Sequence, residues 1–261
     1  MFKHHNDSIR NITDKLEKDP AVQALLIGGS IAHGFQKASS DVDIMIIVSN
    51  DEYANRLESG QIHYYETESC TYDGGYIDGK YLTVDFMEKV AIKGSEPARF
   101  AYEGVTIAFS RIDGLASIID RITRYPADKK TDNIVKFYSQ FEAWHWYSHE
   151  AIKHGNTYLL QHSITQFILF GGRLILAEAE VLYPYHKWFL EVLERVIDKP
   201  DLIMDNINAL LNTPTEENIK QFHTSIKSFK DWGIDPHSWP NQFMKDSELN
   251  WMDGIIPVAD I

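Results

Sequence analysis

The sequence of 261 residues has little cysteine, no excess of basic residues and no long apolar run. Its single cysteine, Cys70, excludes an internal disulfide and a zinc site made of several cysteines. Scarce cysteine is typical of a reducing compartment, so we expect a cytoplasmic protein. Lysine and arginine number 25 against 38 aspartate and glutamate residues, which gives a net charge of −13. Because phosphate neutralisation needs clustered basic side chains, this balance argues against general binding to nucleic acid or to an anionic membrane.

Membrane segments and secretion signals are not expected either. The most apolar stretch, residues 164–177, contains Arg173 and is shorter than the roughly 18–20 residues that span a bilayer. Residues 1–19 lack the apolar core of a signal peptide. We therefore interpret 164–177 as a buried helix. Apolar residues make up 44% of the chain and charged residues 24%, which excludes a disordered or collagen-like protein.

The pattern of the chain changes near residue 127. Short runs typical of strands alternate with turn signals before this point, and helical periodicity dominates after it. The change predicts an α+β protein: residues 1–125 form a mixed sheet with helices on one side, and residues 126–261 form an all-α bundle. The tail from Gly233 is expected to be an irregular strap packed on the core.

The local patterns predict individual elements. The predicted strands are residues 22–27, 41–48, 62–69 and 105–109. Residues 72–77 and 81–87 are predicted to form a hairpin with a type I′ turn at Asp78 and Gly79. The predicted helices are residues 7–19, 30–36, 114–124, 132–154, 158–181, 184–198, 201–211 and 215–232.

Two carboxylates on one predicted strand are the main chemical signal. Asp41 and Asp43 are two residues apart, so their side chains leave the same face of a sheet, about 7 Å apart along the chain. Ionised carboxylates on an otherwise apolar strand are costly unless a cation neutralises them, and oxygen ligands suit Mg²⁺. Alternation over residues 81–87 turns Asp85 toward the polar face of its strand. Three carboxylates could then hold two metal ions, as in phosphoryl or nucleotidyl transfer. The plainer alternative is that Asp41 and Asp43 only begin a strand after a turn.

A glycine-rich turn precedes this pair. Gly28, Gly29 and Ser30 stand between a predicted strand and a short helix, where glycine lets the backbone approach a ligand closely. Free backbone N–H groups and the Ser30 hydroxyl would donate hydrogen bonds there. We therefore predict a phosphate cradle one loop before the metal-binding pair.

These residues together resemble a known family. The pattern consists of Gly29-Ser30, Ser40-Asp41-Val42-Asp43 and Asp85. It is similar to the nucleotidyltransferase superfamily of DNA polymerase beta, over about residues 20–110. The small size and the helical second half look most like the kanamycin-type antibiotic nucleotidyltransferases and their minimal relatives. His33 is a departure, because many relatives have arginine just before the second glycine of the loop.

The resemblance implies roles for five residues. Gly29 and Ser30 would bind the phosphates of a nucleoside triphosphate (NTP), and Asp41 and Asp43 would bind Mg²⁺, with two ions expected. Asp85 would bind metal, act as the general base, or do both.

Two residues of the helical half are further candidates. Residues 182–188 resemble a Pro-Tyr-x-Lys-Trp run of these relatives, which implies that Lys187 reaches the nucleotide phosphates. In the kanamycin-type relatives a glutamate of the helical region is the general base, and Glu142 is the candidate here. The alternatives are that Lys187 is a surface lysine and that Glu142 belongs to the polar face of its helix.

Several histidines are given no function. His145, His149 and His154 follow one another at close to helical spacing, but no acidic partner is evident, so they are interpreted as surface or groove residues. His4 and His5 are near the start of the sequence and predict nothing.

The predicted activity is that of an Mg²⁺-dependent nucleotidyltransferase of the EC 2.7.7 class. It moves a nucleoside monophosphate from an NTP, ATP included, to a hydroxyl of a small molecule and releases pyrophosphate. An acidic surface would suit a cationic acceptor such as an aminoglycoside, which implies antibiotic resistance. The chain is expected to be a monomer or a homodimer and to bind neither nucleic acid nor membrane. The alternative is a regulatory or toxin–antitoxin module that binds or modifies a protein partner.

Overall fold

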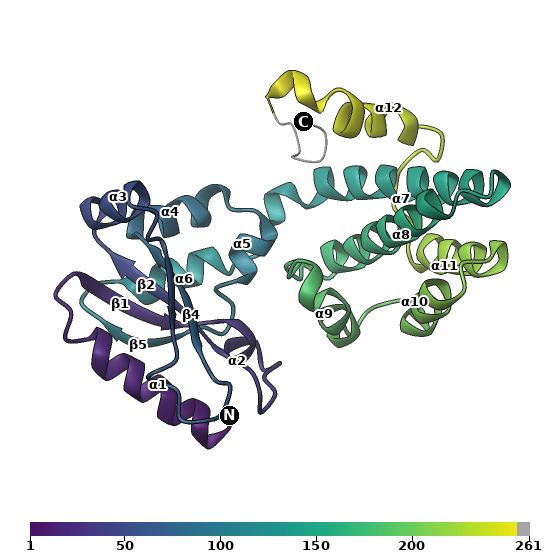
Figure 1. Cartoon of the computed structure of the whole chain (residues 1–261). Coiled ribbons are helices and arrows are strands. Elements are labelled where there is room, and N and C mark those ends of the chain that lie inside the picture. The colour runs from purple at the N-terminus through teal and green to yellow at the C-terminus, as the bar shows by residue number, and fades with distance from the viewer. Residues whose placement is uncertain (255–261) are drawn as a thin grey trace. The chain divides into compact units, whose positions relative to one another are not determined.

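The computed structural model describes residues 1–254 (Figure 1). The chain divides into two compact units, Met1–Arg124 and Tyr125–Ile261. Each unit has its own core and is described by itself. The division into a sheet domain at residues 1–125 and a helical-bundle domain at residues 126–261 stays a prediction.

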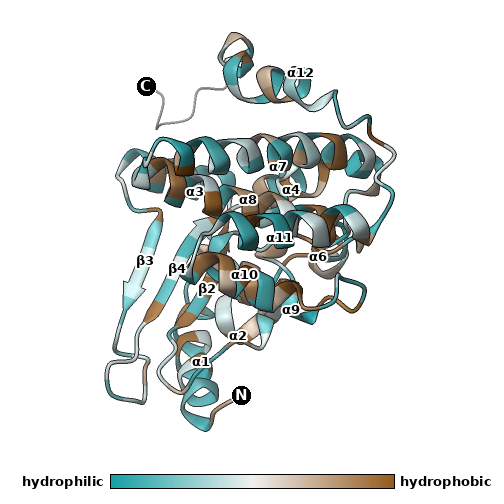
Figure 2. Ribbon diagram, turned by 90° about the vertical axis from the view of Figure 1, so that its right-hand side faces the viewer, coloured by the Kyte–Doolittle hydropathy of each residue, from teal (hydrophilic) through white to brown (hydrophobic). Residues whose placement is uncertain are grey.

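The first unit is built on a five-stranded sheet in the order β3-β4-β2-β1-β5. The strands are β1 (Val22–Ile27), β2 (Val42–Val48), β3 (His63–Glu66), β4 (Ile77–Leu82) and β5 (Thr106–Ser110). β2 and β4 are parallel, and the other neighbouring pairs are antiparallel, so the sheet is mixed. β1 and β2 are almost entirely buried, as their apolar sequences require. In Figure 2, β2 accordingly has brown hydrophobic residues, whereas the edge strand β3 is mostly hydrophilic.

Helices cover both faces of this sheet, so the expectation of helices on one side is wrong. α1 (Lys3–Leu16) packs Ile12 and Leu16 against one face of β1 and β2. The opposite face packs against α4 (Val84–Lys93) and α6 (Leu115–Ile122). The cause is the sequence of the two central strands, because apolar side chains on both faces need a covering layer on each. The predicted α+β class with a mixed sheet is confirmed.

The predicted hairpin over residues 72–87 is wrong. Asp78 and Gly79 lie inside β4 rather than in a turn, and residues 84–87 begin α4. Gly79 is needed for packing, because a Cβ at this position would lie 2.5 Å from Cγ1 of Ile44 on β2. The hydroxyl of Thr83 accepts a hydrogen bond from the N–H of Phe86 at 3.0 Å and so caps α4 at its start.

Two further helices of the first unit were not expected. α3 (Asn50–Glu58) begins after Ser49, whose side chain accepts a hydrogen bond from the N–H of Glu52. α5 (Glu96–Phe100) has proline near its first position, as is common at helix starts. The short helix after the glycine turn is α2 (Gly29–His33).

The second unit is helical. Its main helices are α7 (Lys130–Lys153), α8 (Thr157–Glu178), α9 (Phe189–Arg195), α10 (Ile203–Asn212) and α11 (Glu216–Phe229). The predicted helix over 184–198 is instead a 3₁₀ turn, η2 (His186–Trp188), followed by α9. Within residues 1–254, no helix is long and apolar enough to pass through a bilayer.

The segment from Gly233 is more regular than expected. It forms α12 (Trp239–Phe243), a π-helical turn (Met244–Glu248) and a 3₁₀ turn (Asn250–Asp253). Phe243 packs edge-on against Trp144 of α7, and Gln140 of α7 donates a hydrogen bond to Ser247 at 2.7 Å. The segment is therefore attached to α7. The end of the predicted strap, residues 255–261 with Pro257, lies outside the described residues.

Candidate functional site

Three carboxylates meet at one end of the parallel strand pair. Asp43 of β2 and Asp78 of β4 are direct register partners, so their side chains leave the same face of the sheet. Asp41 precedes β2, and one carboxylate oxygen from each of Asp41, Asp43 and Asp78 lies within 4.8 Å of the others. All three residues are partly exposed. Such an oxygen cluster suits a hard divalent cation such as Mg²⁺, which also keeps water and phosphate ligands.

The glycine turn lies directly against this cluster. The N–H of Gly28 donates to the carbonyl of Asp43 at 2.9 Å. Gly29 has φ +59°, and a Cβ there would lie 1.7 Å from Oδ2 of Asp43. Only glycine fits this position, because both the backbone conformation and the space exclude a side chain. Glycine at position 29 therefore lets the Asp43 carboxylate lie directly against the turn.

Ser30 adds a buried hydroxyl, with the residue 6% exposed. Within the described part of the chain, its Oγ has no hydrogen-bond partner. A buried hydroxyl without a partner is costly, and a ligand oxygen would satisfy it. The residues present therefore fit an Mg²⁺-bound phosphate group, with carboxylates for the metal and a hydroxyl for the phosphate.

The turn before Asp41 is fixed by α1 and by a tyrosine. The carbonyl of Ser40 lies 3.0 Å from Nε2 of His5 and accepts a hydrogen bond from the hydroxyl of Tyr72 at 2.6 Å. His5 is fully buried, and burial is the main reason that its pKa is lowered. His4 makes a similar contact, with Nε2 2.9 Å from the carbonyl of Ala38. Position alone predicted nothing for these histidines, yet they hold the chain where Asp41 begins the site.

Two further side chains adjoin the carboxylates. Nε2 of His63, on β3, lies 2.6 Å from Oδ1 of Asp78. Lys80 follows Asp78 by two residues on β4, so both point to the same face. Loss of hydration lowers the pKa of Lys80, while the negative charge of Asp43 opposes that shift. Sequence reasoning missed Asp78, His63 and Lys80 because it placed Asp78 in a turn.

Asp85 is not part of this cluster. It lies in the first turn of α4, beyond the opposite end of β4 from Asp78, and is exposed. Its Oδ2 accepts a hydrogen bond from Nδ2 of Asn50 at 2.8 Å, at the start of α3. The expectation of a strand over residues 81–87 that delivers Asp85 to the metal pair is therefore wrong. Asp78 occupies the place expected for the third carboxylate.

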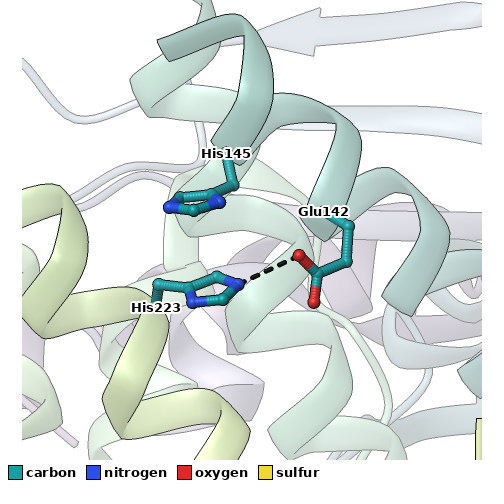
Figure 3. Close-up of side chains that lie close together, drawn as sticks. All are labelled: Glu142, His145 and His223. Atoms are coloured by element: carbon teal, nitrogen blue, oxygen red, sulfur yellow. Dashed lines mark hydrogen bonds and ion pairs between the residues drawn. The ribbon is translucent and has the colours of Figure 1, made fainter. Parts of the chain in front are cut away.

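The other two candidates lie in the second unit. Lys187 is exposed in η2, with its ammonium 4.9 Å from the centre of the Trp188 ring. Glu142, on α7, lies 3.0 Å from Nε2 of His223 and accepts from Nζ of Lys227 at 2.8 Å (Figure 3). Burial alone would raise the pKa of Glu142, but these hydrogen bonds outweigh it and lower the pKa to about 2. A carboxylate held this strongly in its charged form is a weak proton acceptor, so its role as general base stays a prediction.

Residues 7–104 match the family model of the nucleotidyltransferase domain. The first unit therefore contains a nucleotidyltransferase domain, which confirms the resemblance drawn from the motifs.

A solved structure also resembles the chain. The chain is similar to a nucleotidyltransferase-like protein from Exiguobacterium sibiricum 255-15, with 11% identity and a TM-score of 0.47. The likeness covers 95% of this chain and 79% of that one. No curated protein matches the chain.

Proposed function

We propose that the protein is an Mg²⁺-dependent nucleotidyltransferase that moves a nucleoside monophosphate from an NTP to a hydroxyl of a small molecule. The observation that supports this most is the meeting of three carboxylates with the Gly28–Ser30 turn inside a nucleotidyltransferase domain. Because its donor is an NTP, we propose that the protein acts in the cytoplasm.

Asp41, Asp43 and Asp78 would hold the metal. When bound, Mg²⁺ supplies positive charge that stabilises the negative charge developing on the phosphates. Gly29 lets the Asp43 carboxylate lie against the turn, and the Ser30 hydroxyl would donate to a phosphate oxygen. Asp78 thus takes the place that the resemblance gave to Asp85.

Two lysines are proposed to add positive charge for the leaving pyrophosphate. Lys80 shares the face of β4 with Asp78, next to the carboxylates. Lys187 is proposed for the same purpose because its motif resembles the lysine run of related enzymes. A lysine ammonium acts on phosphate as a compact point charge.

The transfer step forms a bond between the acceptor oxygen and the α-phosphorus of the NTP. It breaks the bond between this phosphorus and the oxygen that bridges it to the β-phosphorus. Pyrophosphate leaves with that oxygen, and the proton of the acceptor hydroxyl passes to Asp78. The acceptor that we propose to test first is a cationic one of the aminoglycoside kind, which connects the activity to antibiotic resistance. The net charge of −13 supports this choice, because negative potential concentrates cations.

The test is pyrophosphate release with each of the four NTPs and Mg²⁺, against aminoglycosides, lincosamides and plain buffer. We expect release that needs one acceptor and is lost in Asp43→Asn. The matched control is Asp51→Asn, which removes an exposed carboxylate of α3 and should retain release. NTP binding without release for any acceptor would contradict the small-molecule acceptor and favour a protein partner. Absence of Mg²⁺-dependent NTP binding would contradict the whole proposal.

A further inference from the structure

A second group of metal-ligating side chains lies in the helical unit, separate from the carboxylates of the sheet. Glu142 and His145 lie on α7, and His223 lies on α11 (Figure 3). One ligand atom from each of these residues lies within 4.8 Å of the other two. All three residues are partly buried.

The packing of the two helices brings these side chains together. His145 follows Glu142 by three residues, which places both on one side of α7. The rings of His145 and His223 stack, with centroids 3.9 Å apart and planes at 12°. The ring of Phe141 also stacks on His223, with a centroid distance of 5.3 Å and an angle of 3°. The imidazole of His223 therefore contacts both of these rings, and its Nε2 lies 3.0 Å from Oε2 of Glu142.

We propose that Glu142, His145 and His223 bind a divalent transition-metal ion of the Zn²⁺ type and thereby link α7 to α11. Two imidazoles and a carboxylate are a common donor set for zinc. Bonds of about 2.0–2.2 Å in a tetrahedral site place donor atoms about 3.4 Å apart. The three donor atoms lie within 4.8 Å of one another, so binding needs side-chain rotation to bring them to this spacing. Water would fill the fourth position.

The chemistry separates this site from the carboxylate site. Imidazole nitrogens select Zn²⁺, Co²⁺ or Ni²⁺ over Mg²⁺, whereas an all-oxygen site prefers the harder ion. Metal binding at Nε2 of His223 requires the tautomer that carries its hydrogen on Nδ1, so a bond to the metal replaces the contact between Nε2 and Glu142. The site goes beyond the proposed transfer reaction and does not depend on it.

Lys227 is the internal competitor for Glu142. Its ammonium donates to Oε1 at 2.8 Å and also contacts the hydroxyl of Tyr138. Oε2 faces His223 instead, so one carboxylate oxygen is available to a metal without loss of the lysine contact. Because a cation already balances Glu142, the affinity of the native site should be lower than that of a site without the lysine.

The experiment is a Co²⁺ titration of the full-length, untagged chain in a large excess of Mg²⁺, which fills the carboxylate site. We expect one Co²⁺ per chain, with the visible absorption of a tetrahedral nitrogen-ligated ion and with displacement by Zn²⁺. His145→Gln and His223→Gln should each lose this absorption. The matched control is His154→Gln, which replaces an exposed histidine at the end of α7. This variant should bind Co²⁺ as tightly as the native chain does.

A second variant keeps the test informative if the histidine variants do not fold. Lys227→Met removes the competing ammonium and should tighten Co²⁺ binding by about tenfold. Circular dichroism establishes that each variant retains its helices. The proposal is overturned if the native chain takes up no Co²⁺ or Zn²⁺, if only Lys227→Met binds, or if folded His223→Gln binds as tightly as the native chain.

Discussion

Asp43 and Asp78 are direct partners on the parallel strands β2 and β4, and their carboxylates leave the same face of the sheet. Asp85 stands beyond the other end of β4, where it accepts a hydrogen bond from Asn50. The structure therefore places Asp78 beside Asp43 and places Asp85 away from it, although the sequence alone favoured Asp85 as the third carboxylate.

The first prediction compares these two residues. Asp78→Asn should lower pyrophosphate release by about 100-fold or more, because it removes a charge from the proposed metal site. Asp85→Asn should change release by less than about threefold, since that carboxylate lies outside the cluster and accepts a hydrogen bond from Asn50. Initial rates at saturating NTP and Mg²⁺ measure both effects. Equal losses in the two variants would contradict the assignment of Asp78.

The second prediction concerns the contact between Gly29 and Asp43. Gly29→Ala should abolish measurable transfer, because its Cβ would lie 1.7 Å from Oδ2 of Asp43 and displace that carboxylate. The matched control is Gly34→Ala. Gly34 also has positive φ, at +71°, but a Cβ there meets no atom within 4 Å. Both alanines pay about 1–2 kcal/mol for the left-handed backbone, so a selective loss in Gly29→Ala reports the clash. Mg²⁺-dependent NTP binding by calorimetry and pyrophosphate release provide the two readouts.

The third prediction concerns Arg99, a buried side chain that joins two helix ends. It donates to the carbonyls of Ala91 at 2.9 Å, Gly94 at 3.1 Å and Ile122 at 3.1 Å, at the ends of α4 and α6. Arg99→Met should destabilise the first unit by about 2–4 kcal/mol, because these buried carbonyls lose their donor. All six tryptophans lie between positions 144 and 251, in the second unit, so tryptophan fluorescence would not report the unfolding of the first unit. Hydrogen exchange of peptides from β1 and β2 measures it.

The control for Arg99 is a second arginine nearby. Arg121 pairs with Glu88 on the surface at 2.5 Å, and its side chain is 43% exposed. Arg121→Met should cost less than about 1 kcal/mol, as is usual for exposed ion pairs. If the amide hydrogens of β1 and β2 exchange at the same rate in the two variants, Arg99 does not hold α4 and α6 together.

The local part of the site could be predicted from the sequence. Gly29, Ser30, Asp41 and Asp43 lie within fifteen positions of one another, and the structure brings them together around one turn and one strand. Strand periodicity and glycine chemistry are local properties, so they are visible in a short window. The same reasoning predicted the strand at Val22–Ile27 without error in its bounds.

The remaining residues depend on contacts distant in sequence. Asp78 joins the site only because β4 pairs with β2 in parallel, and an Asp-Gly pair between apolar runs equally predicts a hairpin turn. The capping pattern that starts with Thr83 was the available signal for a helix at residues 84–93. His223 lies 81 positions from Glu142, so the acidic partner of the helical histidines could not be recognised from spacing along one helix.

The fourth prediction concerns Glu103, whose pKa burial raises from 4.5 to about 7. The folded state therefore holds a proton that the unfolded state releases above about pH 4.5. As the pH rises from about 4.5 to about 7, the free energy of unfolding should fall, and it should level off above pH 7. The glutamine in Glu103→Gln cannot ionise. The free energy of unfolding of this variant should therefore equal that of the native chain near pH 4 and exceed it by about 1–3 kcal/mol at pH 8, after allowance for partial exposure. Hydrogen exchange of β1 and β5 peptides across this range tests the prediction, with Glu58→Gln as the exposed control. A pH profile for Glu103→Gln that runs parallel to the native one would show that burial does not retain the proton on Glu103.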